Sequence, residues 1–128
     1  MPIRMMLIDD NQDDLLFTRI ALKRSGLDCE VIEFERAEKA LELLGTDAAH
    51  GVDLILLDIN MPGMDGFHFL VEFEALSASR NVAVVMLSSS SDPSDQWRAS
   101  QHRSVRGFLN KPLTRVDATS LAEMILKS

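Results

Sequence analysis

Short apolar runs alternate along the chain with segments in which apolar residues recur at helical spacing. The apolar runs predict five strands, over residues 3–8, 29–34, 52–57, 82–87 and 107–110. The helical spacing predicts five helices: from residue 12 to a stop at Gly26, over 38–44 closed by Gly45, over 67–78, from Pro93 onward, and over 114–127 capped by Thr114. Strands and helices therefore alternate strictly.

This alternation indicates how the elements are arranged in space. The runs at 52–57 and 82–87 are almost continuously aliphatic, which is typical of parallel strands covered by helices on both faces. Right-handed crossovers restrict the topology to a few doubly wound arrangements. We therefore expect an α/β fold with a doubly wound, five-stranded parallel sheet in three αβα layers. Its functional residues should lie at the carboxyl ends of the strands.

Composition limits the classes of function. The chain has 128 residues, of which 46% are hydrophobic and 26% charged, and this suits one soluble domain. No apolar run approaches the roughly 18 residues of a membrane span, and a net charge of −7 argues against nucleic-acid binding. A single cysteine, Cys29, excludes an internal disulfide, and no signal peptide is visible. We expect a cytoplasmic protein with neither a nucleic acid nor a membrane as its partner.

Polar residues stand where four of the predicted strands end. These residues are Asp9 and Asp10, Asp58, Ser88 and Lys111. If the first and third strands are neighbours, their ends lie about 5 Å apart and the three carboxylates share one pocket. Mg²⁺ prefers oxygen ligands and would relieve the repulsion among them. Lys111 would lie roughly 10 Å from Asp58, within reach of an anion carried there.

Each of these signals also has a purely structural interpretation. The aspartate pair can cap a helix, Asp58 can cap a turn, Ser88 can cap a serine-rich loop, and a lysine before proline is usually solvated. Their convergence at four strand ends favours a joint site, which we predict to bind Mg²⁺ beside a carboxylate able to carry an anion.

The chain resembles the receiver domains of two-component response regulators. The resemblance runs nearly end to end and rests on four segments, IDDNQDD, LILLDINMPGMDGF, VVMLSSSSD and FLNKPL. It implies a flavodoxin-like strand order 2-1-3-4-5 and one receiver domain over residues 1–128 without an output domain. The chain looks most like stand-alone receivers that serve phytochrome-type and other sensor kinases. Such a module takes a phosphoryl group from a sensor histidine kinase or a phosphotransfer protein and is not a turnover enzyme.

The resemblance also implies the roles of the acidic residues. Asp58 would be the phosphoacceptor. Asp10 would bind Mg²⁺ directly, Asp9 mostly through water, and Asn60 through its backbone carbonyl.

The remaining residues would sense the phosphoryl group. Ser88 would hydrogen-bond its oxygens and Lys111 would pair with them, which assigns both side chains to the phosphoryl group and not to the ground-state fold. The Lys111–Pro112 peptide bond would be cis. The loop after the fourth strand would shift together with Phe108, which stands where the family usually has tyrosine or another aromatic. A downstream protein, or a second copy of the chain, would bind the face of the fourth helix, fifth strand and fifth helix.

Some features depart from the family pattern. Residues 94–106 carry few apolar anchors, so we expect the fourth helix to be short or mobile. Trp97 would be either a contact residue of the binding face or a half-buried packing residue. The three histidines show no ligand spacing and are interpreted as surface or packing residues, namely His50, His68 and His102.

Two other functions compete with the phosphorelay hypothesis. A Mg²⁺-dependent phosphohydrolase with an aspartyl nucleophile typically has an acid two residues later, where this chain has Asn60. A flavin-binding electron carrier of the same topology needs a phosphate loop rich in glycine and hydroxyl groups after the first strand. This chain has acidic residues there, which would repel a phosphate.

Overall fold

The computed structural model describes residues 2–46, 51–90 and 92–126. Five parallel strands form one sheet, in the order β2-β1-β3-β4-β5. They are β1 (Ile3–Ile8), β2 (Cys29–Phe34), β3 (Leu54–Asp58), β4 (Ala83–Ser88) and β5 (Val105–Asn110). The expected doubly wound order is confirmed.

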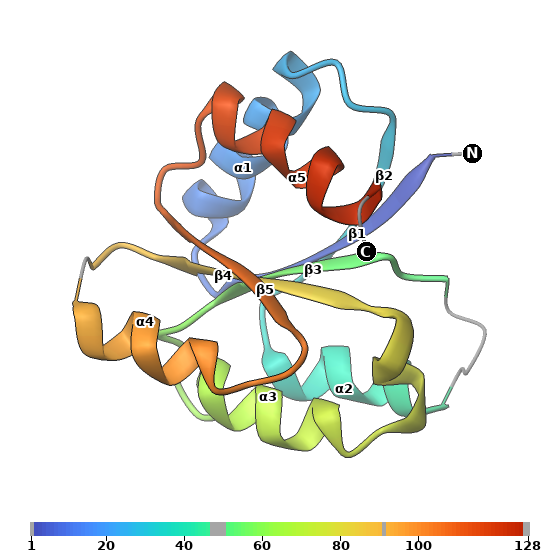
Figure 1. Ribbon diagram of the computed structural model, residues 1–128, viewed down its shortest axis with the longest axis vertical. Helices are drawn as coiled ribbons and strands as arrows, with labels where there is room; N and C mark the ends of the chain where they lie inside the picture. Colours follow the sequence, from blue (N-terminus) through green and yellow to red (C-terminus); the bar gives the residue numbers. More distant parts are fainter. Residues whose placement is uncertain (1, 47–50, 91, 127–128) are drawn as a thin grey trace.

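Helices cover both faces of the sheet, as Figure 1 shows. The helices α1 (Gln12–Arg24) and α5 (Arg115–Leu126) lie on one face. The other face is covered by α2 (Ala37–Thr46), α3 (Gly66–Glu74) and α4 (Pro93–Ser100), and a 3₁₀ turn, η1 (Ser77–Asn81), follows α3. None of these helices is long and apolar enough to span a membrane within the described residues.

The strands are continuously aliphatic because each of them feeds two cores. Successive side chains point to opposite faces of a strand, so Ile55 and Leu57 of β3 pack toward α2 and α3 while Leu54 and Leu56 pack toward α1 and α5. All four side chains are buried. Each one removed from water contributes about 1.5 to 3 kcal/mol, which offsets the entropy of ordering the chain.

Several predicted boundaries differ from the observed ones. Gly45 lies inside α2 and does not end it; the helix continues to Thr46, whose hydroxyl donates a hydrogen bond to the Glu42 carbonyl. The third helix ends at Glu74, four residues earlier than expected, and η1 begins at Ser77 after a short turn. β3 begins two residues later than expected. β5 begins two residues earlier, because Val105 pairs with Val84 before a register irregularity.

The helix starts follow the predicted capping chemistry. Pro93 occupies the first turn of α4, and Asp92 caps that helix. Thr114 and Asp117 form a reciprocal box, in which each side chain accepts from the other's backbone N–H. The last helix is described as far as Leu126, and Lys127 lies outside the described residues.

Candidate functional site

The carboxyl ends of β1 and β3 bring three carboxylates into one pocket. Asp9 follows β1 directly and Asp58 is the last residue of β3, and both are buried, with 4% and 5% of their surfaces exposed. Asp10 is exposed beside them. One oxygen from each of the three carboxylates lies within 4.8 Å of the others. The pocket expected from the strand ends is present.

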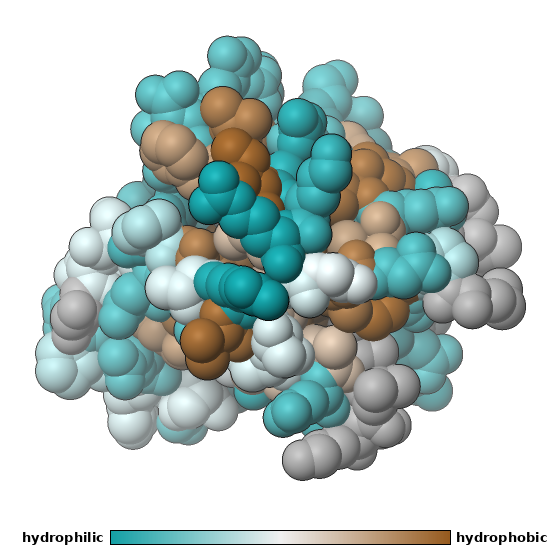
Figure 2. All heavy atoms as spheres, turned by 90° about the horizontal axis from the view of Figure 1, so that it is seen from above, coloured by the Kyte–Doolittle hydropathy of each residue, from teal (hydrophilic) through white to brown (hydrophobic). Residues whose placement is uncertain are grey.

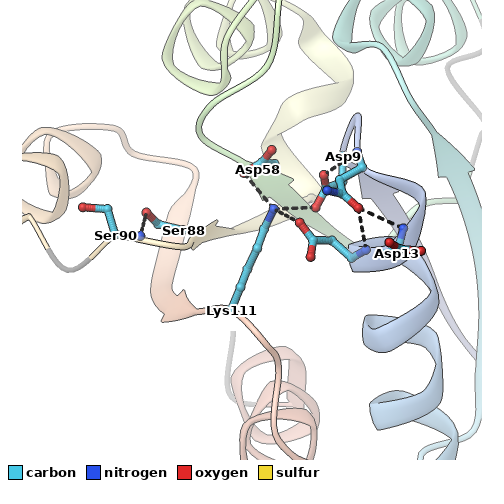
Figure 3. A network of polar contacts seen from close by, with 8 residues as sticks. Asp9, Asp13, Asp58, Ser88, Ser90 and Lys111 are labelled. Atoms are coloured by element: carbon cyan, nitrogen blue, oxygen red, sulfur yellow. Dashed lines mark hydrogen bonds and ion pairs between the residues drawn. The ribbon is translucent and has the colours of Figure 1, made fainter.

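The ammonium of Lys111 lies at the centre of this pocket (Figure 3). Its Nζ is 2.7 Å from Asp9 Oδ2, 2.9 Å from Asp14 Oδ2 and 3.1 Å from Asp58 Oδ1. The assignment of Lys111 to the phosphoryl group alone is therefore wrong. An ammonium buried among carboxylates pairs with them already in the unphosphorylated fold, because an unpaired charge there is costly.

The sequence analysis missed Asp14. The chain turns from β1 into α1 over the pocket, so an acid in the first turn of α1 reaches Lys111. The side chain of Asn11 fixes this turn by accepting the backbone N–H groups of Asp13 and Asp14. The adjacent acids at 13 and 14 were a visible signal, but acids in a first helical turn are common for reasons of the helix dipole alone.

The site shifts the ionisation of its own groups. Burial, together with the negative charge of Asp9, raises the pKa of Asp58 from 3.8 to about 6, against the opposing effects of Lys111 and the Asn60 backbone N–H. Burial alone would lower the pKa of Lys111, but hydrogen bonds to Asp9 and Asp14 and the charge of Asp58 raise it above its ordinary value. Asp58 is therefore mostly ionised at neutral pH, and its ionisation lowers the stability of the fold.

Asp58→Asn is expected to increase the free energy of unfolding above pH 6 without divalent cations. A carboxyl whose pKa is higher in the folded state destabilises the fold as it ionises, so the wild type loses stability as pH rises from 3.8 to about 6. Asparagine does not ionise, so the variant avoids this loss of stability, which is on the order of 3 kcal/mol. Denaturant unfolding at about pH 4 and about pH 8 measures it. An equal gain at both pH values would contradict the prediction.

The turn after Asp58 packs tightly beneath it. A Cβ on Gly66 would lie 2.6 Å from the Asp58 carbonyl oxygen and 3.0 Å from Ile59 Cα, so only glycine fits at the start of α3. Gly63 has a φ of +77°, and the Glu38 side chain accepts the N–H of the next residue, Met64. These contacts fix the backbone that carries Asp58 and Asn60.

Ser88 lies at the end of β4, but among the described residues its side chain makes no hydrogen bond with Lys111 or with the carboxylates paired to it. Its hydroxyl oxygen accepts the backbone N–H of Ser90 at 3.0 Å, and the side chain stands apart from Asp58 in Figure 3. The Ser90 hydroxyl in turn accepts the N–H of Asp92, the cap of α4. The serine-rich loop thus links the end of β4 to the start of α4.

Phe108 is half-buried on β5, and the Lys111–Pro112 peptide bond that follows this strand is cis. Phe108 lines a cavity of about 240 Å³ between α4 and β5. Trp97 of α4 is 67% exposed. The interpretation of Trp97 as a half-buried packing residue is wrong, which leaves its side chain accessible to a partner.

Polar contacts anchor the segment between α4 and β5. The Glu74 carboxylate, at the end of α3, accepts the backbone N–H and hydroxyl of Ser104, at 2.9 and 2.6 Å, and lies 2.9 Å from His102 Nδ1. His102 also stacks on Phe67. α4 is short, as expected, but its connection to β5 is tied to α3 by hydrogen bonds in place of apolar anchors. His68 is an exposed partner of Glu72, and His50 lies outside the described residues.

Figure 2 shows a view of the molecule from above, in which hydrophilic side chains surround scattered apolar ones. Exposed apolar side chains on α1 include Leu16, Phe17 and Ile20, with exposed fractions between 38% and 53%. Phe17 and Ile20 line a groove with Pro112 and Leu113, directly beside the residue that carries the ammonium. The site therefore has both charged and apolar surroundings.

Comparisons with known proteins agree with this geometry. The family model of the response regulator receiver domain matches residues 5–124. Two-component response regulator ARR6 of Arabidopsis thaliana is 31% identical over 98% of this chain and 70% of its own length. A two-component response regulator structure from Cytophaga hutchinsonii covers 100% of both chains with a TM-score of 0.91 and 27% identity. The bacteriophytochrome response regulator AtBRR covers 98% of this chain and 93% of its own, with a TM-score of 0.81 and 27% identity. The chain belongs to the receiver domains of two-component response regulators.

Proposed function

We propose that Asp58 accepts a phosphoryl group from a sensor histidine kinase or a phosphotransfer protein. The observation that carries this proposal is a buried carboxylate 3.1 Å from an ammonium at the carboxyl edge of the sheet. The Asp58 carboxylate attacks phosphorus, a new oxygen–phosphorus bond forms, and the bond from phosphorus to the donor nitrogen breaks. Because its pKa is about 6, Asp58 is mostly ionised at neutral pH and is competent as a nucleophile.

The residues of the pocket fit Mg²⁺ as the cofactor. The groups that could ligate an ion are all oxygens, and the pocket holds four carboxylates, of which three pair with the one ammonium, so the site carries excess negative charge. Asp9, Asp10, Asp58 and the backbone carbonyl of Asn60 would hold the ion. When bound, it supplies positive charge for the oxygens of the transferred group.

Lys111 and Ser88 then bind the negatively charged phosphoryl group. Phosphorylation adds about two negative charges at Asp58. The Lys111 ammonium can redirect some of its N–H donors from the carboxylates to these oxygens. Ser88 accepts the Ser90 N–H through its hydroxyl oxygen, so its O–H remains available as a donor, and a turn of the side chain toward the phosphoryl oxygens would alter the contact that orders the loop before α4. Phe108 borders the cavity between α4 and β5, into which a ring can move.

Binding partners would distinguish the two states at the face of α4, β5 and α5. The exposed Trp97 belongs to α4, and the face suits a downstream protein or a second copy of the chain. We propose that residues 1–128 act as one receiver unit in the cytoplasm, in keeping with the unpaired Cys29. Asn60, where a phosphohydrolase has an acid, favours slow self-dephosphorylation over turnover.

Incubation with acetyl phosphate is expected to add one phosphoryl group to the chain in Mg²⁺ and none in excess EDTA. The four carboxylates repel a phosphoryl donor unless a divalent cation offsets their charge. Intact-mass spectrometry follows the adduct, which should be lost in hydroxylamine because acyl phosphates react with it. An adduct that forms equally well in EDTA would overturn the Mg²⁺ assignment, and no adduct in either condition would overturn the proposed function.

A further inference from the structure

The Lys111 ammonium uses three carboxylates from three parts of the fold. An ammonium has three N–H donors, and its partners here are Asp9 after β1, Asp58 at the end of β3 and Asp14 on α1. Asp9 and Asp58 belong to the group of oxygens that could hold a metal ion, and Asp14 does not. One of the three acceptors therefore stays with Lys111 when a divalent cation engages the other two.

The position of Asp14 suits this separate role. Its backbone N–H donates to Asn11 Oδ1 at 3.1 Å, which fixes it in the first turn of α1. A carboxylate there is also stabilised by the helix dipole. The side chain is 31% exposed, so Asp14 lies at the rim of the pocket while Asp9 and Asp58 lie deeper.

We propose that Asp14 is a positioning residue that keeps the Lys111 ammonium at the mouth of the pocket while Asp9 and Asp58 bind the cation. This inference rests on the proposed function. With one donor held by Asp14, the other two are free to meet the oxygens of an arriving phosphoryl group. Without Asp14, the ammonium on its flexible stem turns into water when the cation takes its other partners, because nothing else within the described contacts of Lys111 retains it.

The test measures the amine reactivity of Lys111 and needs no phosphorylation. The chain is treated briefly with acetic anhydride, with and without saturating Mg²⁺, and acetylation of each lysine is quantified by peptide mass spectrometry. The exposed Lys23 and Lys39 are internal standards. In the wild type, Lys111 should stay protected in both conditions. In Asp14→Asn, Mg²⁺ should increase Lys111 acetylation about tenfold, the equivalent of one lost charge-assisted hydrogen bond.

Two further variants separate positioning from general loosening. Asp13→Asn removes the same charge from the same helical turn but no contact to Lys111, so it should behave as wild type. Asp14→Glu retains a carboxylate and should restore most of the protection. The inference is overturned if Asp14→Asn does not expose Lys111 in Mg²⁺, or if Asp13→Asn exposes it equally. Phosphorylation of the wild type is measured separately by intact mass. If Asp14 protects Lys111 but no phosphoryl adduct forms, the proposed function is refuted and the positioning role of Asp14 is retained.

Discussion

Asp58→Asn is expected to reduce the phosphoryl adduct formed from acetyl phosphate and Mg²⁺ to background. The substitution replaces the attacking oxygen by an amide that is not nucleophilic, while the volume and the neighbouring Asp9 and Lys111 are retained. Asp58→Asn should be the more stable protein at neutral pH without divalent cations, and a cation that binds only the folded state does not destabilise it, so loss of the adduct is not explained by unfolding. Intact-mass spectrometry of both proteins at matched concentrations provides the measurement.

Asp13→Asn is the matched control for this experiment. It makes the same change of charge on an exposed carboxylate near the pocket and should accept phosphate like the wild type. If Asp58→Asn still acquires a phosphoryl group, peptide mapping would identify the acceptor. If that variant forms an adduct at Asp9 or Asp10 at the wild-type rate, Asp58 is not the phosphoacceptor.

The fold and the acidic pocket could be predicted because both depend on simple periodic signals. An aliphatic run that ends in Asp58 identifies a central parallel strand and its functional edge at once. The strand order of a doubly wound sheet then places Asp9 beside Asp58 whatever the loops do. The predicted helix end at Gly45 was wrong because a glycine permits a helix to end but does not require it. The packing of α2 decides where that helix ends.

The finer contacts could not be predicted because they depend on where helix ends lie in space. The pairing of Asp14 with Lys111 joins residues 97 positions apart and requires the angle at which α1 leaves the sheet. The contact of Ser104 with Glu74 likewise depends on how α3 ends. Ser104 therefore has a side-chain partner that no local sequence pattern reveals.

Lys111→Met is expected to lower the free energy of unfolding by about 3 kcal/mol at pH 8 without Mg²⁺. The variant keeps most of the apolar stem but leaves the buried Asp9 and Asp58 without their cation. Lys111 lowers the pKa of Asp58, so its removal raises that pKa further above its ordinary value. Asp58 is protonated in both proteins below about pH 6 and then no longer repels Asp9, so the defect should be larger at about pH 8 than below about pH 6.

Mg²⁺ should restore much of the lost stability of Lys111→Met, since a bound divalent cation supplies the charge that the ammonium provided. Denaturant unfolding of wild type and variant, at about pH 5 and about pH 8 and with or without Mg²⁺, separates these contributions. Lys39→Met removes a charge that is exposed to solvent. It should show neither the pH dependence nor the restoration of stability by Mg²⁺. A defect in Lys111→Met that is equal under all four conditions would mean that the side chain stabilises the fold by packing. The ammonium would then contribute nothing measurable as the countercharge of Asp9 and Asp58.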